Sequence, residues 1–195
     1  GYTIDRNAPE GDGSSSVFVI KNSTFTITDT SAAKTGKITG GNADNGGGIN
    51  AVRCTLNVNG GNITGNKALK NGGGIYVDGG ECHIDGGTVS DNVATSYGGG
   101  VYINNCFATM LSGSVCGNEA EYGGGVYLND TDFDMRGGEI SDNEAYHGGG
   151  VYLYSDTFDL YDGVIARNSA TSNGGGVYSY DTFIMNGGEI SENYS

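Results

Sequence analysis

The chain has 195 residues and is rich in glycine and acidic residues, with 38 Gly, one Pro, no Trp and a net charge of −14 at pH 7. Residues 98–195 carry 14 Asp and Glu but only two basic residues, Arg136 and Arg167. Nucleic acid and anionic membrane surfaces are therefore excluded as partners, because both are bound by clustered Lys and Arg. No run of 18 apolar residues is present, so the sequence predicts no segment inserted in a membrane.

The first 45 residues differ from the rest of the chain. Apolar alternation typical of a strand begins at Val17 and resumes at Phe25, and residues 32–36 have the composition of an inserted loop. Terminal units of repeat proteins commonly depart from the repeat. We therefore expect residues 1–45 to form an irregular first coil or cap, followed by a single repeat domain over residues 46–195.

A repeat fills the chain from Gly46 onward. The triplet Gly-Gly-Gly begins at Gly46, Gly72, Gly98, Gly123, Gly148 and Gly174, with a period of 25 or 26 residues. Within one repeat, apolar residues are paired at i, i+2 in Val126 with Leu128 and in Phe133 with Met135, and a third cluster surrounds Ile140. This is the spacing of strands with one buried face, and a fixed period of this length is typical of a solenoid. The sequence predicts an all-β parallel β-helix of six to seven coils, each with three short strands.

One polar position recurs among the apolar columns. It holds Asn66, Asn92, Asn118, Asn143, Asn168 and Asn193. We interpret this column as a buried ladder at a corner of the coil, because the amide both donates and accepts hydrogen bonds and Asn tolerates left-handed backbone. Asn-linked glycosylation is the alternative, but only Asn193 begins an Asn-x-Ser/Thr pattern. The glycine triplets are expected to provide positive φ and close approach of the backbone at another corner.

The four cysteines do not have the spacing of a zinc site. Cys54, Cys82 and Cys106 lie near the second strand of consecutive coils, where neighbours are close enough to form a disulfide, and Cys116 lies on an outward position. Unpaired small core residues are the other interpretation. The sequence does not distinguish a disulfide from unpaired cysteines.

Four aspartates on two consecutive coils are the candidate metal ligands: Asp132, Asp134, Asp156 and Asp159. Carboxylate oxygens are the ligands that Ca²⁺ prefers, so a calcium site is one hypothesis, and no other cofactor is expected. Asp134 and Asp159 are also expected about 5 Å apart, which is the separation of the carboxyl pair in a retaining glycosidase. A solvated acidic face is the third interpretation. His83 and His147 are isolated in the sequence and are expected at the surface.

The motifs GGGVYLND, FDMRGGEIS and DNEAYHGGG resemble the glycine-rich repeats of bacterial cell-surface proteins with the pectin-lyase-like superfold. They are also similar to the Gly-Gly-Ala-Ile and Phe-x-x-Asn repeats of polymorphic outer-membrane adhesins. The resemblance covers residues 46–195 and implies a right-handed parallel β-helix on a secreted or surface-displayed protein. The same superfold includes polysaccharide lyases and glycoside hydrolases, but the Trp-Ile-Asp-His, Asn-Thr-Asp and Gly-His-Gly motifs of those enzymes are missing from this sequence.

An aromatic column is the candidate binding site. The outward position of the first strand holds Tyr76, Tyr102, Tyr127, Tyr152 and Tyr178. We expect five rings on one outer face, in an exposed strip about 19 Å long, because coils are spaced by roughly 4.8 Å. Exposed aromatic rings suit the apolar faces of sugars or another protein surface. The alternative is that the rings only stabilise the stacking of the coils.

These observations together favour a non-enzymatic, extracellular β-helix module of a bacterial cell-surface protein. It is expected to act as an adhesive stalk that binds a carbohydrate or a protein, and to be part of a larger parent chain. The alternatives are a polysaccharide lyase or glycoside hydrolase of the same superfold and a purely structural spacer.

Overall fold

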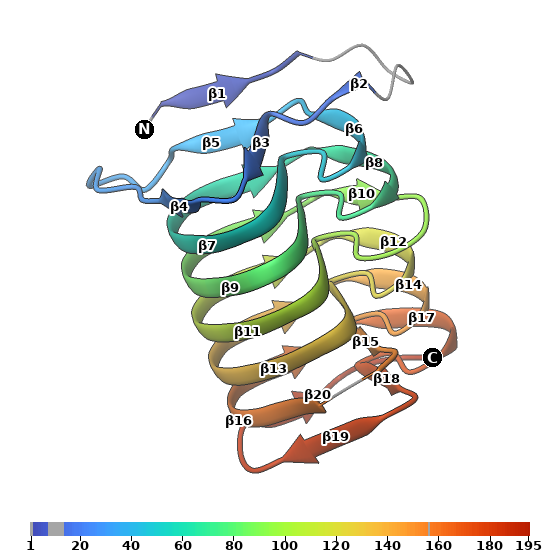
Figure 1. The fold of residues 1–195 in the computed structure, drawn as a ribbon. Coiled ribbons are helices and arrows are strands. Elements are labelled where there is room, and N and C mark those ends of the chain that lie inside the picture. The colour runs from blue at the N-terminus through green and yellow to red at the C-terminus, as the bar shows by residue number, and fades with distance from the viewer. Residues whose placement is uncertain (1, 8–13, 156) are drawn as a thin grey trace.

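The computed structural model describes residues 2–7, 14–155 and 157–195 and shows a parallel β-solenoid of about six turns (Figure 1). The all-β fold expected from the sequence is confirmed. The strands are β1 (Thr3–Asp5), β2 (Ser14–Ser15), β3 (Phe18–Lys21), β4 (Thr24–Ile27), β5 (Lys37–Thr39), β6 (Asn42–Asn45), β7 (Ile49–Thr64), β8 (Lys67–Asn71), β9 (Ile75–Ser90), β10 (Val93–Ala94), β11 (Val101–Cys116), β12 (Glu119–Tyr122), β13 (Val126–Ser141), β14 (Glu144–His147), β15 (Val151–Leu153), β16 (Thr157–Ala166), β17 (Ser169–Asn173), β18 (Val177–Ser179), β19 (Thr182–Met185) and β20 (Glu189–Ser191).

Each inner coil contains one long bent strand and one short strand. β7, β9, β11 and β13 each have 16 residues and pair in parallel with the next coil along almost their whole length. The three short strands expected per coil are therefore joined. In β13 the chain turns at Asp130 and Gly138, which have φ of 45° and 85°, and pairing with the neighbouring coils resumes after each turn.

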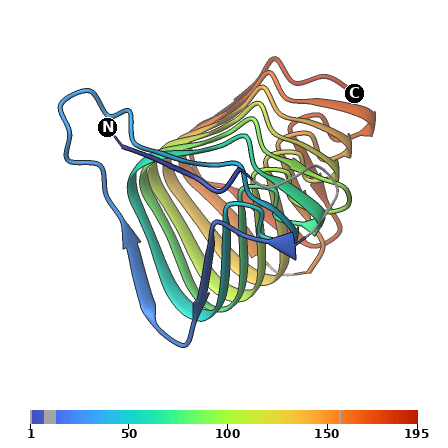
Figure 2. The same cartoon turned by 90° about the horizontal axis from the view of Figure 1, so that it is seen from above.

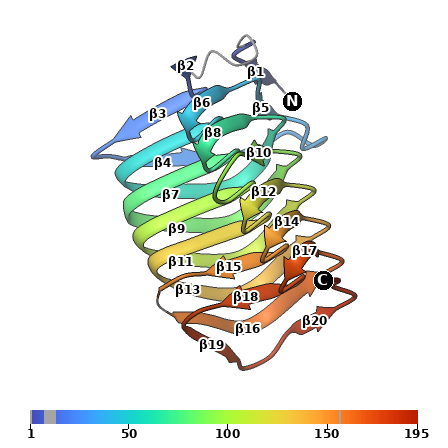
Figure 3. The ribbon, with the colours of Figure 1, turned by 90° about the vertical axis from the view of Figure 1, so that its right-hand side faces the viewer.

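The short strand after the asparagine corner was not expected from the sequence. β8, β10, β12, β14 and β17 form a separate sheet with β6 and β2 (Figure 3). Each of the five carries a single inward alanine, such as Ala120 or Ala145. One small residue leaves no i, i+2 apolar pair, so the sequence pattern that marks the other strands is missing here.

The inward columns of the long strands form one continuous core. Val101, Val126 and Val151 follow one another in register, and each has an exposed fraction of 0–1%. The core continues through Phe133 and Phe158, whose ring centroids are 5.1 Å apart. Because each coil covers the next, apolar side chains that one coil alone would leave exposed are buried on both sides.

The start of the chain is more regular than the irregular coil expected from the sequence. β3 and β4 pair in register with β7, and β1 pairs with β5 one level further along the stack. The expected insert is present as a loop over residues 28–36 that extends away from the stack (Figure 2). Asp29 holds this loop, because its carboxylate accepts hydrogen bonds from the backbone N–H groups of Ser31 and Gly36 at 2.9 and 2.8 Å.

All four cysteines are free thiols. Cys54 and Cys106 share a column with Gly80 between them, whereas Cys82 lies two residues further along the strand, in register with Ala108. The cysteines of consecutive coils are therefore in different columns and do not form the disulfide that the sequence left open. Burial raises the pKa of the Cys106 thiol to about 11, which keeps it protonated and unreactive.

Candidate functional site: an aromatic face beside a buried amide ladder

The asparagine column forms a continuous hydrogen-bonded ladder inside the solenoid. The side chain of Asn118 donates from Nδ2 to Oδ1 of Asn143 at 2.9 Å, and the same Oδ1 accepts from the backbone N–H of Asn118 at 3.0 Å. Nδ2 of Asn118 also donates to the carbonyl of Val89 at 3.0 Å. The same pattern links Asn66, Asn92, Asn118, Asn143, Asn168 and Asn193 in order. These amides therefore satisfy one another and the backbone of the corner.

The left-handed residue at this corner is not the asparagine, as the sequence suggested, but the residue before it. Asp91, Asp142 and Arg167 have φ of 54°, 57° and 56°. These side chains lie in solvent, and the positive φ turns the following asparagine into the interior. The amide is thus selected for its hydrogen bonds rather than for its backbone preference.

The glycine triplet leaves space for this ladder. Gly123 has a φ of 66°, which favours glycine. A Cβ on Gly125 would lie 2.8 Å from Nδ2 of Asn143 and 2.6 Å from the carbonyl oxygen of Gly150. The first glycine of a triplet is therefore needed for backbone conformation and the third for the close approach of the next coil.

The five predicted tyrosines stack on the outer side of the first-strand segment. Their ring centroids are 5.1–5.3 Å apart, and successive planes are tilted by only 5–26°. We call Tyr76, Tyr102, Tyr127, Tyr152 and Tyr178 the tyrosine column. Because the rings lie face to face along the stack, neighbouring rings of the column occupy the flat faces that were expected to receive a sugar.

The tyrosine column is also less exposed than expected. Tyr127 and Tyr152 have exposed fractions of 7% and 6%. A second row, formed by Tyr97, Tyr122 and His147, packs against the column: Tyr97 lies 4.7 Å from Tyr127 and Tyr122 lies edge-on 5.4 Å from Tyr152, measured between centroids. His147 is therefore part of an aromatic layer rather than an isolated surface residue.

The residues of this second row all precede a glycine triplet. The position holds Asn45, Asn71, Tyr97, Tyr122, His147 and Asn173 in successive coils. When the repeats are aligned on the triplets, the residue before each triplet is aromatic in three successive coils, and this is the sequence signal for the second row. The row lies beside the column because the triplet turns the chain sharply between the two positions.

Burial raises the pKa of the phenols in the tyrosine column. The pKa of Tyr102 is raised to about 12, first by desolvation and then by the neighbouring Tyr76 and Asp78. Desolvation also raises the pKa of Tyr127 and Tyr152. The phenols are therefore neutral at physiological pH, so the column itself carries no charge.

Three further tyrosines lie around the C-terminal part of the column and point to solvent. Tyr146, Tyr154 and Tyr180, with exposed fractions of 50%, 55% and 65%, form what we call the tyrosine rim. Tyr180 is edge-on to Tyr178 at 5.3 Å, and Tyr146 is edge-on to His147 at 4.5 Å. The rim is thus anchored on the buried aromatic layer.

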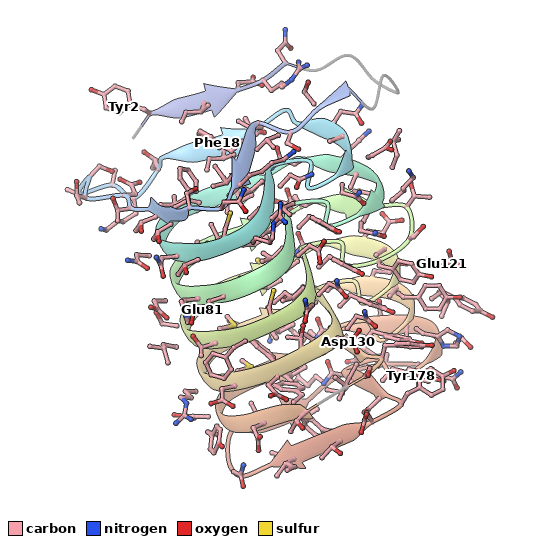
Figure 4. The ribbon with its side chains drawn as sticks, viewed as in Figure 1. Tyr2, Phe18, Glu81, Glu121, Asp130 and Tyr178 are labelled. Atoms are coloured by element: carbon pink, nitrogen blue, oxygen red, sulfur yellow. The ribbon has the colours of Figure 1, made fainter. Side chains whose placement is uncertain are left out.

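An acidic hollow lies next to the rim. It has a volume of about 390 Å³ and is lined by Glu119, Glu121, Glu144 and Tyr146, among others. Figure 4 labels Glu121 and Tyr178 on the same side of the molecule. Glu121 precedes Tyr122 in β12, and its carboxylate raises the pKa of the Tyr122 phenol.

One carboxylate and two amides form a polar run beside the tyrosine column. Nδ2 of Asn104 donates to Oδ1 of Asp78 at 2.7 Å, and Nδ2 of Asn129 donates to Oδ1 of Asn104 at 2.5 Å. This run is partly exposed and was not expected from the sequence. It lies two residues after the column in three successive coils, and in the next two coils the same position holds Tyr154 and Tyr180 of the rim.

The aspartates predicted to bind calcium are partly engaged within the protein. Asp134 and Asp159 are in register, but Arg136 pairs with Asp134 at 2.7 Å and lies 4.4 Å over the ring of Tyr161. Asp159 accepts a hydrogen bond from Nδ2 of Asn186 at 3.0 Å. Asp132 is exposed in the same coil as Asp134, and Asp156 lies outside the described residues.

Among residues 2–7, 14–155 and 157–195, no three His, Cys, Asp or Glu side chains are grouped to hold a metal ion. Calcium binding therefore stays a prediction. It requires the ion to displace Arg136 from Asp134. His83, the other histidine, binds Oγ1 of Thr109 through Nδ1 at 2.9 Å and lies in the same column as Asp134, two coils away.

The comparison with known proteins gives one short match. Residues 60–78 match the model of the Chlamydia polymorphic membrane protein repeat. The matched segment runs from the end of β7 through the Asn66 corner, β8 and the triplet at Gly72 into β9. No curated protein and no solved structure matches the chain. The chain is therefore similar, in this segment, to a repeat of a bacterial surface-protein family.

In the part of the chain that the structure describes, no helix has the length and apolar character needed to cross a membrane.

Proposed function

We propose that this chain is a non-enzymatic module of a bacterial cell-surface protein, located outside the cell, that attaches to a carbohydrate or a protein through the tyrosine rim. The observation that carries the proposal is the exposure of Tyr146, Tyr154 and Tyr180 on top of a packed aromatic layer. Large exposed rings gathered on one face of a protein mark interaction sites.

The underlying layer makes the rim suitable for binding. The stacked column holds Tyr178 and Tyr152 in place, and Tyr180 contacts both rings at centroid distances of 5.3 and 6.1 Å. Rings that are already positioned lose little conformational entropy when a partner binds. The adjacent carboxylates of Glu121 and Glu144 supply acceptors for sugar hydroxyls or for basic side chains.

The similarity of residues 60–78 to the polymorphic membrane protein repeat supports a place on the bacterial surface. The architecture is compatible with that place. Stacked coils joined by continuous backbone pairing form a stiff rod, and a rod carries a binding face away from the surface to which it is attached.

The test measures attachment to a glycan array and to a panel of immobilised extracellular proteins. The triple variant Tyr146→Ser, Tyr154→Ser and Tyr180→Ser should lose attachment at least tenfold at an unchanged melting temperature, because these rings are mainly exposed. Tyr2→Ser is the matched control, since Tyr2 is 92% exposed at the opposite end of the stack. Attachment that survives the triple substitution contradicts the proposal.

The same preparation distinguishes the two alternatives. A lyase or hydrolase of the superfold would release reducing sugar or unsaturated product from polysaccharides. A spacer would neither bind nor cleave any member of the panel.

A further inference from the structure

The hollow beside the tyrosine rim lies in the middle of the sheet formed by the short strands. β12 and β14 are in its centre, and β10 and β17 continue the sheet on either side (Figure 3). Glu119 and Glu144 line the hollow, and Glu121 and Tyr146 line it two residues further along the same strands. Tyr146 is 50% exposed, so one face of its ring is open to a ligand. The hollow is therefore flanked by further coils of the chain on both sides.

The three carboxylates of the hollow have no basic partner in the part of the chain that the structure describes. Glu119, Glu121 and Glu144 are exposed, and none of them takes part in the ion pairs of that part. β10, β12, β14 and β17 contain no Lys or Arg. The negative charge of this face is therefore not neutralised by its own strands.

Two of these carboxylates are placed side by side. Glu119 lies opposite Glu144 in the parallel pair of β12 and β14, and neighbouring coils are spaced by roughly 4.8 Å. Like charges directly opposite one another destabilise a sheet. The pair is therefore unfavourable for folding alone, and it is suited to a positive group that contacts both carboxylates.

The chain itself shows which side chain a carboxylate and an exposed ring bind together. Arg136 pairs with Asp134 at 2.7 Å, and the central carbon of its guanidinium group lies 4.4 Å from the centroid of the Tyr161 ring. Tyr161 is 40% exposed, similar to Tyr146. At the hollow the carboxylates and the ring are present, but the strands supply no guanidinium group.

We infer that the partner bound at the tyrosine rim is a basic protein, and that one of its arginine side chains enters the hollow. The guanidinium group would bridge Glu119 and Glu144 and pack on the ring of Tyr146. Arginine suits the site better than lysine, because its planar fork binds carboxylates through two hydrogen bonds and stacks on aromatic rings. This inference rests on the proposed function and narrows the partner of the rim to a protein.

Charge supports a basic protein over the other occupants. Residues 98–195 contain 14 Asp and Glu against two Arg, a net charge of −12, and a surface of one sign steers a partner of the opposite sign towards it. A metal ion is less suited, because no three acidic, His or Cys side chains of the described residues are grouped to hold one. A neutral sugar would leave the paired carboxylates without a counter-charge.

The probe is the capped peptide acetyl-Gly-Arg-Gly-Arg-Gly-amide, titrated into the full chain in the presence of a chelator. The backbone amide signals of β12 and β14 should shift saturably in NMR spectra, and high salt should weaken the binding. The control peptide carries citrulline in place of both arginines, which keeps the shape and removes the charge. It should bind at least tenfold more weakly.

Two triple variants separate the hollow from the overall charge. Glu119→Gln, Glu121→Gln and Glu144→Gln together should weaken binding of the arginine peptide at least tenfold. This variant should melt at or above the temperature of the parent, because the repulsion between neighbouring carboxylates is relieved. The matched control removes three exposed charges from other faces and should leave binding nearly unchanged: Glu81→Gln, Asp85→Asn and Glu189→Gln.

Equal loss of binding in the two triple variants, or equal binding of the two peptides, overturns the inference. Attachment to a glycan that survives the three glutamine substitutions, but is lost in Tyr154→Ser with Tyr180→Ser, also overturns it and leaves the proposed function intact. Binding of the arginine peptide that depends on the three glutamates, in a chain whose rim variants keep all attachment, supports the hollow as an arginine site and contradicts the proposed function.

Discussion

The asparagine ladder and the tyrosine column repeat in the same way along the chain, but different forces hold them. Each ladder amide donates to and accepts from neighbouring coils, and Asn66 to Asn168 have exposed fractions of 0–1%. The rings of the column contact one another face to face, and their burial changes from partial at Tyr76 to nearly complete at Tyr152. The ladder therefore fixes the register of the coils, while the column adds packing that depends on its neighbours.

Breaking the ladder should have the largest effect. Asn143→Leu removes the acceptor for both the backbone N–H and the side-chain Nδ2 of Asn118, and it removes the donor to Val115. Unpaired buried polar groups cost about 1–3 kcal/mol each, so we expect the free energy of unfolding to fall by at least about 3 kcal/mol in urea denaturation.

Asn193→Leu is the matched control for that substitution. Asn193 is partly exposed at the end of the ladder and donates to Ile165 and accepts from Asn168 only. It should cost on the order of 1 kcal/mol, because water replaces the lost partners. Equal effects of the two substitutions would mean that burial in the ladder does not control stability.

Breaking the column should have a smaller effect. Tyr127→Ser removes a nearly buried ring that contacts Tyr97, Tyr102 and Tyr152. We expect a loss of about 2 kcal/mol, less than for a ring in a closed core, because the outer layer can relax into the space. Tyr127→Phe keeps the ring and should stay within about 0.5 kcal/mol of the parent. Similar melting of all three proteins would show that the column does not stabilise the stack.

The column should also make stability sensitive to alkaline pH. Tyr102 titrates near 10 in the unfolded chain and near 12 in the folded protein. Above pH 10 the unfolded chain therefore loses this proton first, so the stabilisation by neutral Tyr102 is complete below pH 10 and is lost as pH rises towards 12. Denaturation curves at pH 9, 10 and 11 should show a shallower decline for Tyr102→Phe than for the parent. Parallel declines would contradict the raised pKa.

The smallest expected effect concerns calcium. If Ca²⁺ competes with Arg136 for Asp134 and Asp159, millimolar calcium should raise the melting temperature by about 1–2 °C, and by more in Arg136→Gln. Asp134→Asn should remove the shift, and a chelator should reverse it. An absence of heat in calorimetric titration of both the parent and Arg136→Gln would end the calcium hypothesis.

The sequence predicted the features that depend on a single residue in each coil. The inward valines and the ladder asparagines are such positions, and stacking brings each next to its own copy. The cysteine spacing obeys the same rule, since Cys54 and Cys82 are 28 residues apart rather than 26 and so fall in different columns. The short strands around Ala120 and Ala145 carry too little apolar pattern to be recognised.

The exposure of the tyrosine column could not be predicted from its own positions. It depends on Tyr97, Tyr122 and His147, which approach the column only because the glycine triplet folds the chain back beside it. The sequence identified the rings correctly as an outer stack. It did not show that a second aromatic row covers them.

The coils are equivalent within the ladder, because each amide forms a hydrogen bond with an identical amide in the next coil. Removal of residues 118–142 would bring Asn143 to the place of Asn118, below Asn92, with the same donors and acceptors in reach. Duplication of such a unit would extend the ladder in the same way. Gene rearrangements that delete or copy whole repeats can therefore shorten or lengthen this rod in steps of one coil, without any compensating change in its interior.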